Sequence, residues 1–247
     1  MRAVTLEVCA GDVQSAEAAL SGGASRVELC SALGEGGVTP SVGFVREVCK
    51  LQGLAVHVLI RPRGGDFLYS ESEVRVMEED IREMRRCGAD GVVIGALTPD
   101  GHIDRAVCER LVEAAGGMHI TFHRAFDLCC DPLEALDEIQ ALGCDRLLTS
   151  GQAATAEEGI PMLKQLVQRA ADRIVIMPGS GVSVRNARHI LDATGATELH
   201  ASARTLCQSG MSYRRNGVNM GASGTDEFVR KVTDSREVGD LLRAMNG

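Results

Sequence analysis

Several features that would define a function class are missing from this sequence. It contains no stretch of 18 apolar residues, so no transmembrane helix is expected. The few lysines, Lys50, Lys164 and Lys231, all lie away from the expected strand ends, which argues against Schiff-base chemistry. The formal net charge of −8 argues against a general affinity for nucleic acid or for an anionic membrane.

The cysteines lack the spacing of a dedicated metal or redox motif. There are 9 of them, but no CxxC or MxxM segment is present, and the adjacent pair Cys129–Cys130 makes a poor chelate. The first expected strand begins at Ala3, and the sequence shows no long apolar stretch of the kind typical of a signal peptide. We therefore expect reduced thiols in a cytosolic protein, with a nuclear pool left open.

Strand-like and helix-like segments alternate along all 247 residues. Apolar residues with a period near 3.6 indicate helices, most clearly over Glu73–Cys87 and Pro132–Leu142. The composition shows no break, and no GxGxxG opens the first helix, so one closed (β/α)8 barrel spanning 1–247 is favoured over an open doubly wound sheet. A long polar loop, roughly 203–234, follows the eighth strand and precedes a final helix over Arg236–Met245. The eight expected strands are Ala3–Cys9, Ser25–Cys30, Ala55–Arg61, Gly91–Gly95, His119–Arg124, Arg146–Thr149, Arg173–Pro178 and Thr197–Ser202.

A Glu-x-Cys motif ends each of the first two expected strands. Side chains alternate along a strand, so Glu7 and Cys9 share one face, and Glu28 and Cys30 share the same face of the next strand. Neighbouring parallel strands lie ~4.8 Å apart. This arrangement would present two sulfurs to one soft metal ion or to one reacting atom.

Further polar residues gather at the C-terminal ends of the strands, where barrels of this kind place their sites. Buried carboxylates need partners, so we expect Glu7, Glu28 and Glu198 to pair with arginines or histidines near the mouth. Two interpretations stay open: a satisfied polar network that fills the mouth, or a ligand site. The concentration of the polar residues at one end of the barrel favours the ligand site. The expected partners are Arg61, Arg63, His57, His123 and His200.

Two segments of the sequence predict anion binding. Arg61 and Arg63 flank a Gly-Gly turn and offer planar forks suited to carboxylate or phosphate, although they would equally neutralise Glu7, Glu28 or Asp66. The second signal lies after strands seven and eight, where barrels often hold phosphate with backbone amides. Its residues are Gly179, Ser180, Gly181, Ser202 and Arg204.

The same side chains also suit an enzyme that acts on a small anionic or phosphorylated molecule. Isomerase, epimerase or lyase chemistry would use Glu7, Glu28 or Glu198 as the base, with Arg61 and His123 as electrophiles. A third alternative is a binding or assembly protein whose insert forms a subunit contact. The insert residues that would make it are Met211, Tyr213, Arg214 and Arg215.

Several long motifs of the chain resemble those of the CutC copper homeostasis proteins. The resemblance covers nearly the whole chain and implies a TIM-type barrel, a cytosolic homo-oligomer (a dimer or a tetramer) and a role in copper handling. It further implies that Cu(I) binds at Cys9 and Cys30. The motifs are Glu28-Leu29-Cys30-Ser31, Gly36-Gly37-Val38-Thr39-Pro40-Ser41, Arg61-Pro62-Arg63-Gly64-Gly65-Asp66-Phe67, Thr121-Phe122-His123-Arg124-Ala125-Phe126-Asp127, Leu148-Thr149-Ser150-Gly151 and Met177-Pro178-Gly179-Ser180-Gly181-Val182.

The chemistry of Cu(I) is compatible with that implied site. Cu(I) prefers soft thiolate ligands, and either His200 or His123 would be an additional donor. Position 201 is alanine where some members of the family have cysteine or serine, so strand eight supplies no third thiolate. A nearby Arg61 would lower the cysteine pKa values, whereas the neighbouring glutamates would raise them.

Overall fold

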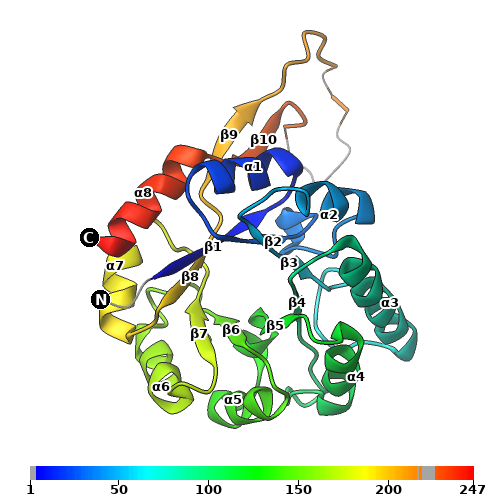
Figure 1. Cartoon of the computed structure of the whole chain (residues 1–247), viewed down its shortest axis with the longest axis vertical. Coiled ribbons are helices and arrows are strands. Elements are labelled where there is room, and N and C mark those ends of the chain that lie inside the picture. Colours follow the sequence, from blue (N-terminus) through cyan, green and yellow to red (C-terminus); the bar gives the residue numbers. More distant parts are fainter. Residues whose placement is uncertain (1–3, 216, 219–225) are drawn as a thin grey trace.

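Eight parallel strands form a ring that is surrounded by helices in the computed structural model (Figure 1), which describes residues 4–215, 217–218 and 226–247. This architecture confirms the barrel expected from the alternating pattern. The strands are β1 (Thr5–Ala10), β2 (Arg26–Leu29), β3 (Ala55–Leu59), β4 (Gly91–Ile94), β5 (His119–Phe122), β6 (Arg146–Thr149), β7 (Val175–Pro178) and β8 (Glu198–Ala201).

The hydrogen-bonded order of the strands is β7-β6-β5-β4-β3-β2-β1-β8, and each pair is parallel. Strands β7 and β8 contact each other and complete the ring, but within the described ranges no ladder of hydrogen bonds joins them. Gly179 follows β7 at this seam. A Cβ added there would lie 2.5 Å from Leu148 Cδ1 of β6 and 3.2 Å from His200 Cβ of β8, so packing against both neighbouring strands favours glycine.

The helices follow the strands in the order that the sequence predicts, and side chains fix where they begin. Asp131 accepts hydrogen bonds from the amides of Leu133 and Glu134 at the start of α5, as expected. The start of α3 differs from the expectation: it begins at Glu71 rather than Glu73, because Ser70 and Glu73 form a capping box. The helices are α1 (Val13–Ser21), α2 (Val42–Val48), α3 (Glu71–Cys87), α4 (Arg105–Ala115), α5 (Pro132–Ala141), α6 (Ile160–Ala170), α7 (Ala187–Thr194) and α8 (Ser235–Asn246), with 3-10 turns η1 (Leu33–Glu35) and η2 (Arg124–Leu128).

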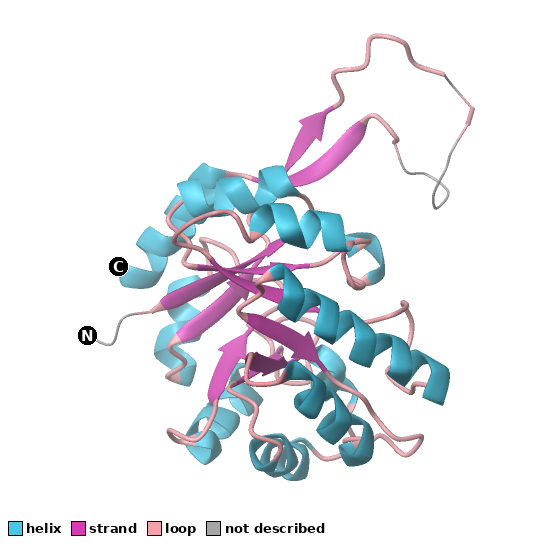
Figure 2. Cartoon of the chain, turned by 45° about the vertical axis from the view of Figure 1, so that its right-hand side comes forward, coloured by secondary structure: helices cyan, strands magenta, loops and turns pink. Residues whose placement is uncertain are grey.

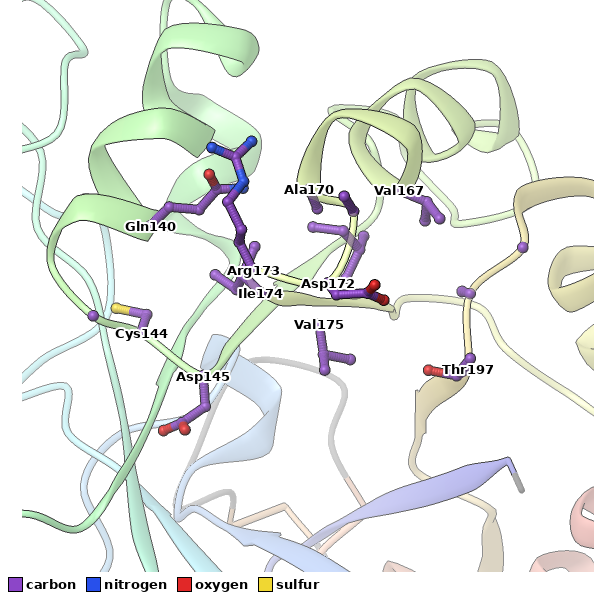
Figure 3. A pocket seen from close by; sticks show the side chains of 15 residues that line it. Gln140, Cys144, Asp145, Val167, Ala170, Asp172, Arg173, Ile174, Val175 and Thr197 are labelled. Atoms are coloured by element: carbon purple, nitrogen blue, oxygen red, sulfur yellow. The ribbon is translucent and has the colours of Figure 1, made fainter. Parts of the chain in front are cut away.

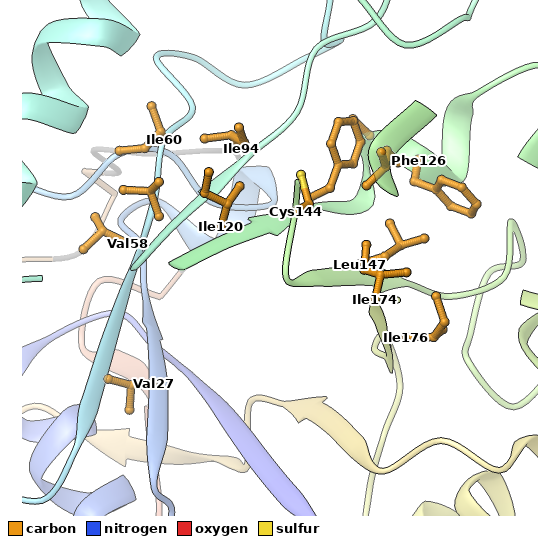
Figure 4. Close-up of a cluster of buried hydrophobic side chains, with 14 of the residues drawn as sticks. Val27, Val58, Ile60, Ile94, Ile120, Phe126, Cys144, Leu147, Ile174 and Ile176 are labelled. Carbon is orange, nitrogen blue, oxygen red and sulfur yellow. The ribbon is translucent and has the colours of Figure 1, made fainter. Parts of the chain in front are cut away.

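The main hydrophobic core lies between the strands and the surrounding helices. Alternate strand residues such as Val58, Ile94 and Leu147 pack there and are fully buried (Figure 4). The remaining alternate positions belong to the interior of the barrel, where a separate small cluster joins Cys9, Cys30, Leu59 and Val93. Most of the other interior positions near this cluster are polar, and they form the candidate site.

The segment after β8 is not the simple loop that its polar composition indicates. Strands β9 (Arg204–Gln208) and β10 (Val229–Thr233) pair antiparallel, with Arg204 opposite Thr233, and form a ribbon that projects from the barrel (Figures 1 and 2). Thr205 and the valines of β10 give these short runs the β-branched character of strands. The insert residues 216 and 219–225 lie outside the described residues.

None of the described helices has the length and apolar character needed to cross a membrane.

Candidate functional site

The structure brings the two predicted thiols into direct contact. Cys9 of β1 and Cys30, which directly follows β2, are both buried, and their Sγ atoms lie 3.2 Å apart. The register pairs Cys9 with Glu28, so the ligand atoms of these three residues all lie within 4.8 Å of one another. The predicted proximity of the sulfurs is therefore observed, and their binding of a metal stays a prediction.

His200 on β8 links this cluster to the neighbouring carboxylates. Its Nδ1 lies 2.9 Å from Glu7 Oε1, and its Nε2 lies 3.6 Å from Glu28 Oε2. Burial alone would lower the pKa of His200, but the contact with Cys9 and the two carboxylates raise it well above its ordinary value. Burial raises the pKa of Glu28 well above its ordinary value, against the opposing charge of His200.

The sequence left open whether Arg61 or the glutamates would dominate the pKa values of the thiols, and for Cys9 neither does. Its hydrogen bond with Cys30, together with burial, raises the pKa of the Cys9 thiol well above the ordinary value. Arg61 is occupied elsewhere: its guanidinium donates to the carbonyl oxygens of Glu35, Gly37 and Gly65. Cys9 is therefore a protonated thiol at neutral pH.

Glu7 and Glu198 are neutralised by arginines that the sequence reasoning missed. Arg26 donates to both carboxylates from the interior of the barrel, and Arg146 Nε donates to Glu198 at 2.9 Å. Burial would raise the pKa of Glu7, but the hydrogen bond from His200 and the charge of Arg26 lower it far below its ordinary range. The expected pairing of these carboxylates with Arg61 and Arg63 is wrong. Strand alternation carried the correct signal, because Arg26 has the same parity as Glu28.

Arg63 lies on the outer side of the third loop. Its Nε donates to Glu73 at 2.6 Å, its Nη2 lies 3.1 Å from Asp66 Oδ1, and its guanidinium stacks on Tyr69. The pairing with Asp66 agrees with the neutralising alternative that the sequence left open. Arg63 does not line the cavity described next.

A cavity of about 350 Å³ opens at the C-terminal end of the barrel, above the thiols. Cys9 lines it, whereas Cys30 lies outside its lining. Most of the predicted anion-binding residues contribute to its wall, but Gly179 and Arg63 do not. The polar lining residues are Cys9, Glu28, Arg61, His123, Arg124, Ser180, His200, Ser202 and Arg204.

His123 is fully enclosed beside this cavity. Its Nδ1 accepts a hydrogen bond from the amide of Ala125, so the ring proton is carried by Nε2, which has no partner among the described residues. Burial, with the charge of Arg61, lowers the pKa of His123 to about 3. The ring packs against Phe67, 4.9 Å between centroids, and is neutral at physiological pH.

Asp127 holds the fifth and sixth loops together, a role that the sequence did not reveal. Its carboxylate accepts hydrogen bonds from Thr149 Oγ1, from the Ser150 amide and hydroxyl, and from the Gln152 amide. Arg124 Nε pairs with it at 2.7 Å. The Asp127 carboxylate therefore positions the loops around His123.

A second cavity, of about 430 Å³, lies at the opposite end of the barrel between the beginnings of β6, β7 and β8 (Figure 3). Asp145, Arg173 and Thr197 contribute its polar lining, together with aliphatic side chains such as Val175. Cys9, Glu28, His123 and His200 all lie at the other mouth. The candidate chemistry is therefore confined to the C-terminal end.

These features define a TIM-type barrel with a buried thiol pair at a polar mouth. The CutC family model matches residues 4–205, so the chain belongs to the CutC family.

The relatives support this assignment across most of the chain. The copper homeostasis protein cutC homolog of Homo sapiens is 50% identical over 237 residues, covering 96% of this chain and 87% of the human protein. A CutC family protein of Chromobacterium violaceum is 50% identical over 241 residues, covering 98% of each chain.

Solved structures agree with the fold. The crystal structure of a copper homeostasis protein CutC from Streptococcus agalactiae superposes with a TM-score of 0.77 at 38% identity, covering 80% of this chain and 97% of that chain. A thiamine phosphate pyrophosphorylase from Pyrococcus furiosus has a TM-score of 0.60 at 16% identity, which shows the barrel fold alone.

Proposed function

We propose that this protein acts in copper homeostasis by binding Cu(I) as cargo through Cys9 and Cys30 at the mouth of the barrel. The observation that carries the proposal is the 3.2 Å contact between two buried, reduced sulfurs. The names of the relatives point to the same metal.

The donor set fits a soft, monovalent ion. Thiolates are the preferred ligands of Cu(I). His200, in contact with Cys9, has a raised pKa and must lose a proton before it can add a borderline nitrogen donor. The Glu28 carboxylate is a hard ligand with little affinity for Cu(I). Because Cys9 is a protonated thiol, metal binding must release a proton and is expected to weaken as the pH falls.

The spacing of the sulfurs shows what binding requires. At 3.2 Å they are not a disulfide, in which sulfurs lie about 2.05 Å apart. Two metal–sulfur bonds of about 2.3 Å place sulfurs on opposite sides of an ion about 4.6 Å apart. A linear Cu(I) complex therefore requires the observed 3.2 Å contact to open by about 1.4 Å.

Titration of reduced protein with Cu(I) against a chromophoric Cu(I) chelator tests the proposal. We expect about one ion per chain and loss of this binding in the double variant Cys9→Ser, Cys30→Ser. The matched control is Cys130→Ser, which removes an exposed cysteine and should bind normally. If the double variant still binds about one Cu(I) per chain, Cys9 and Cys30 are not the copper ligands.

A cytosolic location and assembly into a dimer or a tetramer are part of the proposal. The described cysteines are all free, which suits a reducing compartment. Leu206, Met211 and Tyr213 of the insert are exposed apolar side chains of the kind that subunit contacts cover.

Acid–base catalysis at the same mouth remains the alternative. Of the three glutamates considered as the base, Glu7 and Glu198 are each held by arginine. Glu28 makes no pair with arginine among the described residues, and it lines the cavity. Of the three glutamates, Glu28 is therefore the one that the catalytic alternative would use as the base.

A further inference from the structure

The mouth cavity is much larger than a single metal ion needs. Its volume of about 350 Å³ is in the range of sites that hold small organic molecules, commonly about 300–1,000 Å³. Apolar side chains, including Leu33, Leu148 and Val182, line it together with the polar groups. This mixture of a few polar groups on an apolar wall is typical of a site for an organic ligand.

The cationic groups of this wall favour an anionic ligand. Neither Arg61 nor Arg204 pairs with a carboxylate in the described part of the chain, although the protein carries a net charge of −8. Arg61 is held by three carbonyl oxygens, which accept from three of its four Nη–H groups but do not neutralise its charge. Glu28 is the carboxylate in the same lining, and it faces His200. The mouth is therefore locally positive on an acidic protein, which attracts anions.

Two buried donors in the same wall also lack acceptors. Arg61 Nε and His123 Nε2 have no hydrogen-bond partner within the described residues, and the two residues are only 7% and 4% exposed. Both groups pack against Phe67. An unsatisfied buried donor costs about 1–3 kcal/mol, so an acceptor contributed from the cavity would be stabilising. Water or a ligand oxygen would provide it.

Among the described residues, two sulfurs are available to a metal at this place. Cys9 is the sulfur-bearing residue of the described lining, and Cys30 lies beside it. Position 201, at the end of β8 and also in the lining, is alanine. A third soft donor for the metal must therefore reach it from the cavity, on the exposed side of Cys9.

We propose that the mouth binds a small anionic thiol together with Cu(I): the carboxylate of the ligand is held at Arg61 and Arg204, and its sulfur joins Cys9 and Cys30 on the metal. This inference rests on the proposed copper site and adds the class of molecule that accompanies the ion. The step is a ligand exchange without oxidation. Cu(I) arrives bound by two of the small thiolates. Cys9 and Cys30 each give up a proton and bond to Cu(I), one small thiolate leaves the metal and takes up one of these protons, the other proton goes to solvent, and the second small thiolate keeps its bond to the metal.

Two small thiols that differ in one group test the proposal. 3-Mercaptopropionate carries a carboxylate, and 2-mercaptoethanol carries a hydroxyl in its place. With free Cu(I) fixed by a chromophoric chelator, we expect about tenfold tighter apparent Cu(I) binding in 3-mercaptopropionate, the gain of one charge-assisted contact. Native mass spectrometry should show the protein with one copper and one 3-mercaptopropionate.

Two variants test whether the tighter Cu(I) binding in 3-mercaptopropionate depends on Arg204. In Arg204→Gln the affinity ratio between the two thiols should fall towards one, whereas the exposed Arg236→Gln control should keep the full ratio. Equal affinity in both thiols, with no ternary mass, would overturn the anionic-ligand inference and leave the copper site intact. Absence of Cu(I) binding in 2-mercaptoethanol as well would instead overturn the proposed function.

Discussion

Arg26 neutralises two buried carboxylates, and its removal should destabilise the barrel strongly. The side chain is 5% exposed and donates to Glu7 Oε2 at 2.6 Å and to Glu198. In Arg26→Met a chain of similar length fills the space but leaves Glu7 without its nearest cation. Removing one partner from a buried ion pair costs about 3–5 kcal/mol, and we expect a loss of stability of this size.

The loss caused by Arg26→Met should depend on pH. The folded pKa of Glu7 lies far below its ordinary value of 4.5, so its contribution is present above about pH 4.5 and is lost as the pH falls further. In the variant burial is no longer opposed by Arg26, and the pKa of Glu7 rises. The stability difference between wild type and variant should therefore shrink as the pH is lowered from about 6 to 4.

Urea denaturation followed by circular dichroism at pH 7 and at pH 4 measures both effects. The exposed Arg236→Met is the matched control and should cost less than about 0.5 kcal/mol. If Arg26→Met does not fold, the double variant with Glu7→Gln should restore folding, because position 7 then carries no buried charge and Glu198 keeps its pair with Arg146. A loss below about 1 kcal/mol at pH 7 would refute the role given to Arg26.

Three further perturbations address other parts of the molecule. His123 has a folded pKa of about 3 against an ordinary 6.5, so its contribution to stability is present above pH 6.5 and is lost as the pH falls towards 3. His123→Asn should therefore remove about 1.4 kcal/mol per pH unit of the acid dependence of the unfolding free energy between about pH 6 and 4. Urea denaturation at several pH values would measure this change. Gly179→Ala places a methyl 2.5 Å from Leu148 and should cost about 1–3 kcal/mol in thermal or urea unfolding, whereas Gly34→Ala, with open space around it, should not. Deleting residues within 210–221 should shift the mass measured by light scattering to that of a monomer, and an unchanged mass would reject the insert as a subunit contact.

The barrel was predictable because its signals are local and repeated. Each strand is a short apolar run, and each helix carries its own period and caps, as Asp131 and Gly143 do around α5. The ribbon of β9 and β10 was missed because 20 residues separate its two halves, between Gln208 and Val229, and both halves mix polar with apolar residues. Pairing at that separation depends on contacts that local patterning does not contain.

The contact between the two sulfurs followed from strand alternation, but the partners of the charged groups did not. Arg26 and Arg146 are the first residues of β2 and β6, away from the C-terminal strand ends where the site was expected, although strand alternation places both inside the barrel. The position of Arg61 was unpredictable for a different reason. Its guanidinium binds carbonyl oxygens of Gly37 and Gly65, and the path of those loops depends on left-handed glycine backbone with φ of 93° and 85°.

The meeting of β7 and β8 without a hydrogen-bond ladder has a mechanical consequence. The barrel wall is an eight-stranded sheet whose edge strands, β7 and β8, are held together by packing rather than by a ladder of hydrogen bonds. Moving β7 and β8 apart breaks no strand-to-strand hydrogen bond in the described wall, so widening the mouth of the barrel costs the least free energy there. Gly179 on one edge lies against His200 on the other. The compliant part of the wall thus adjoins the imidazole that contacts Cys9.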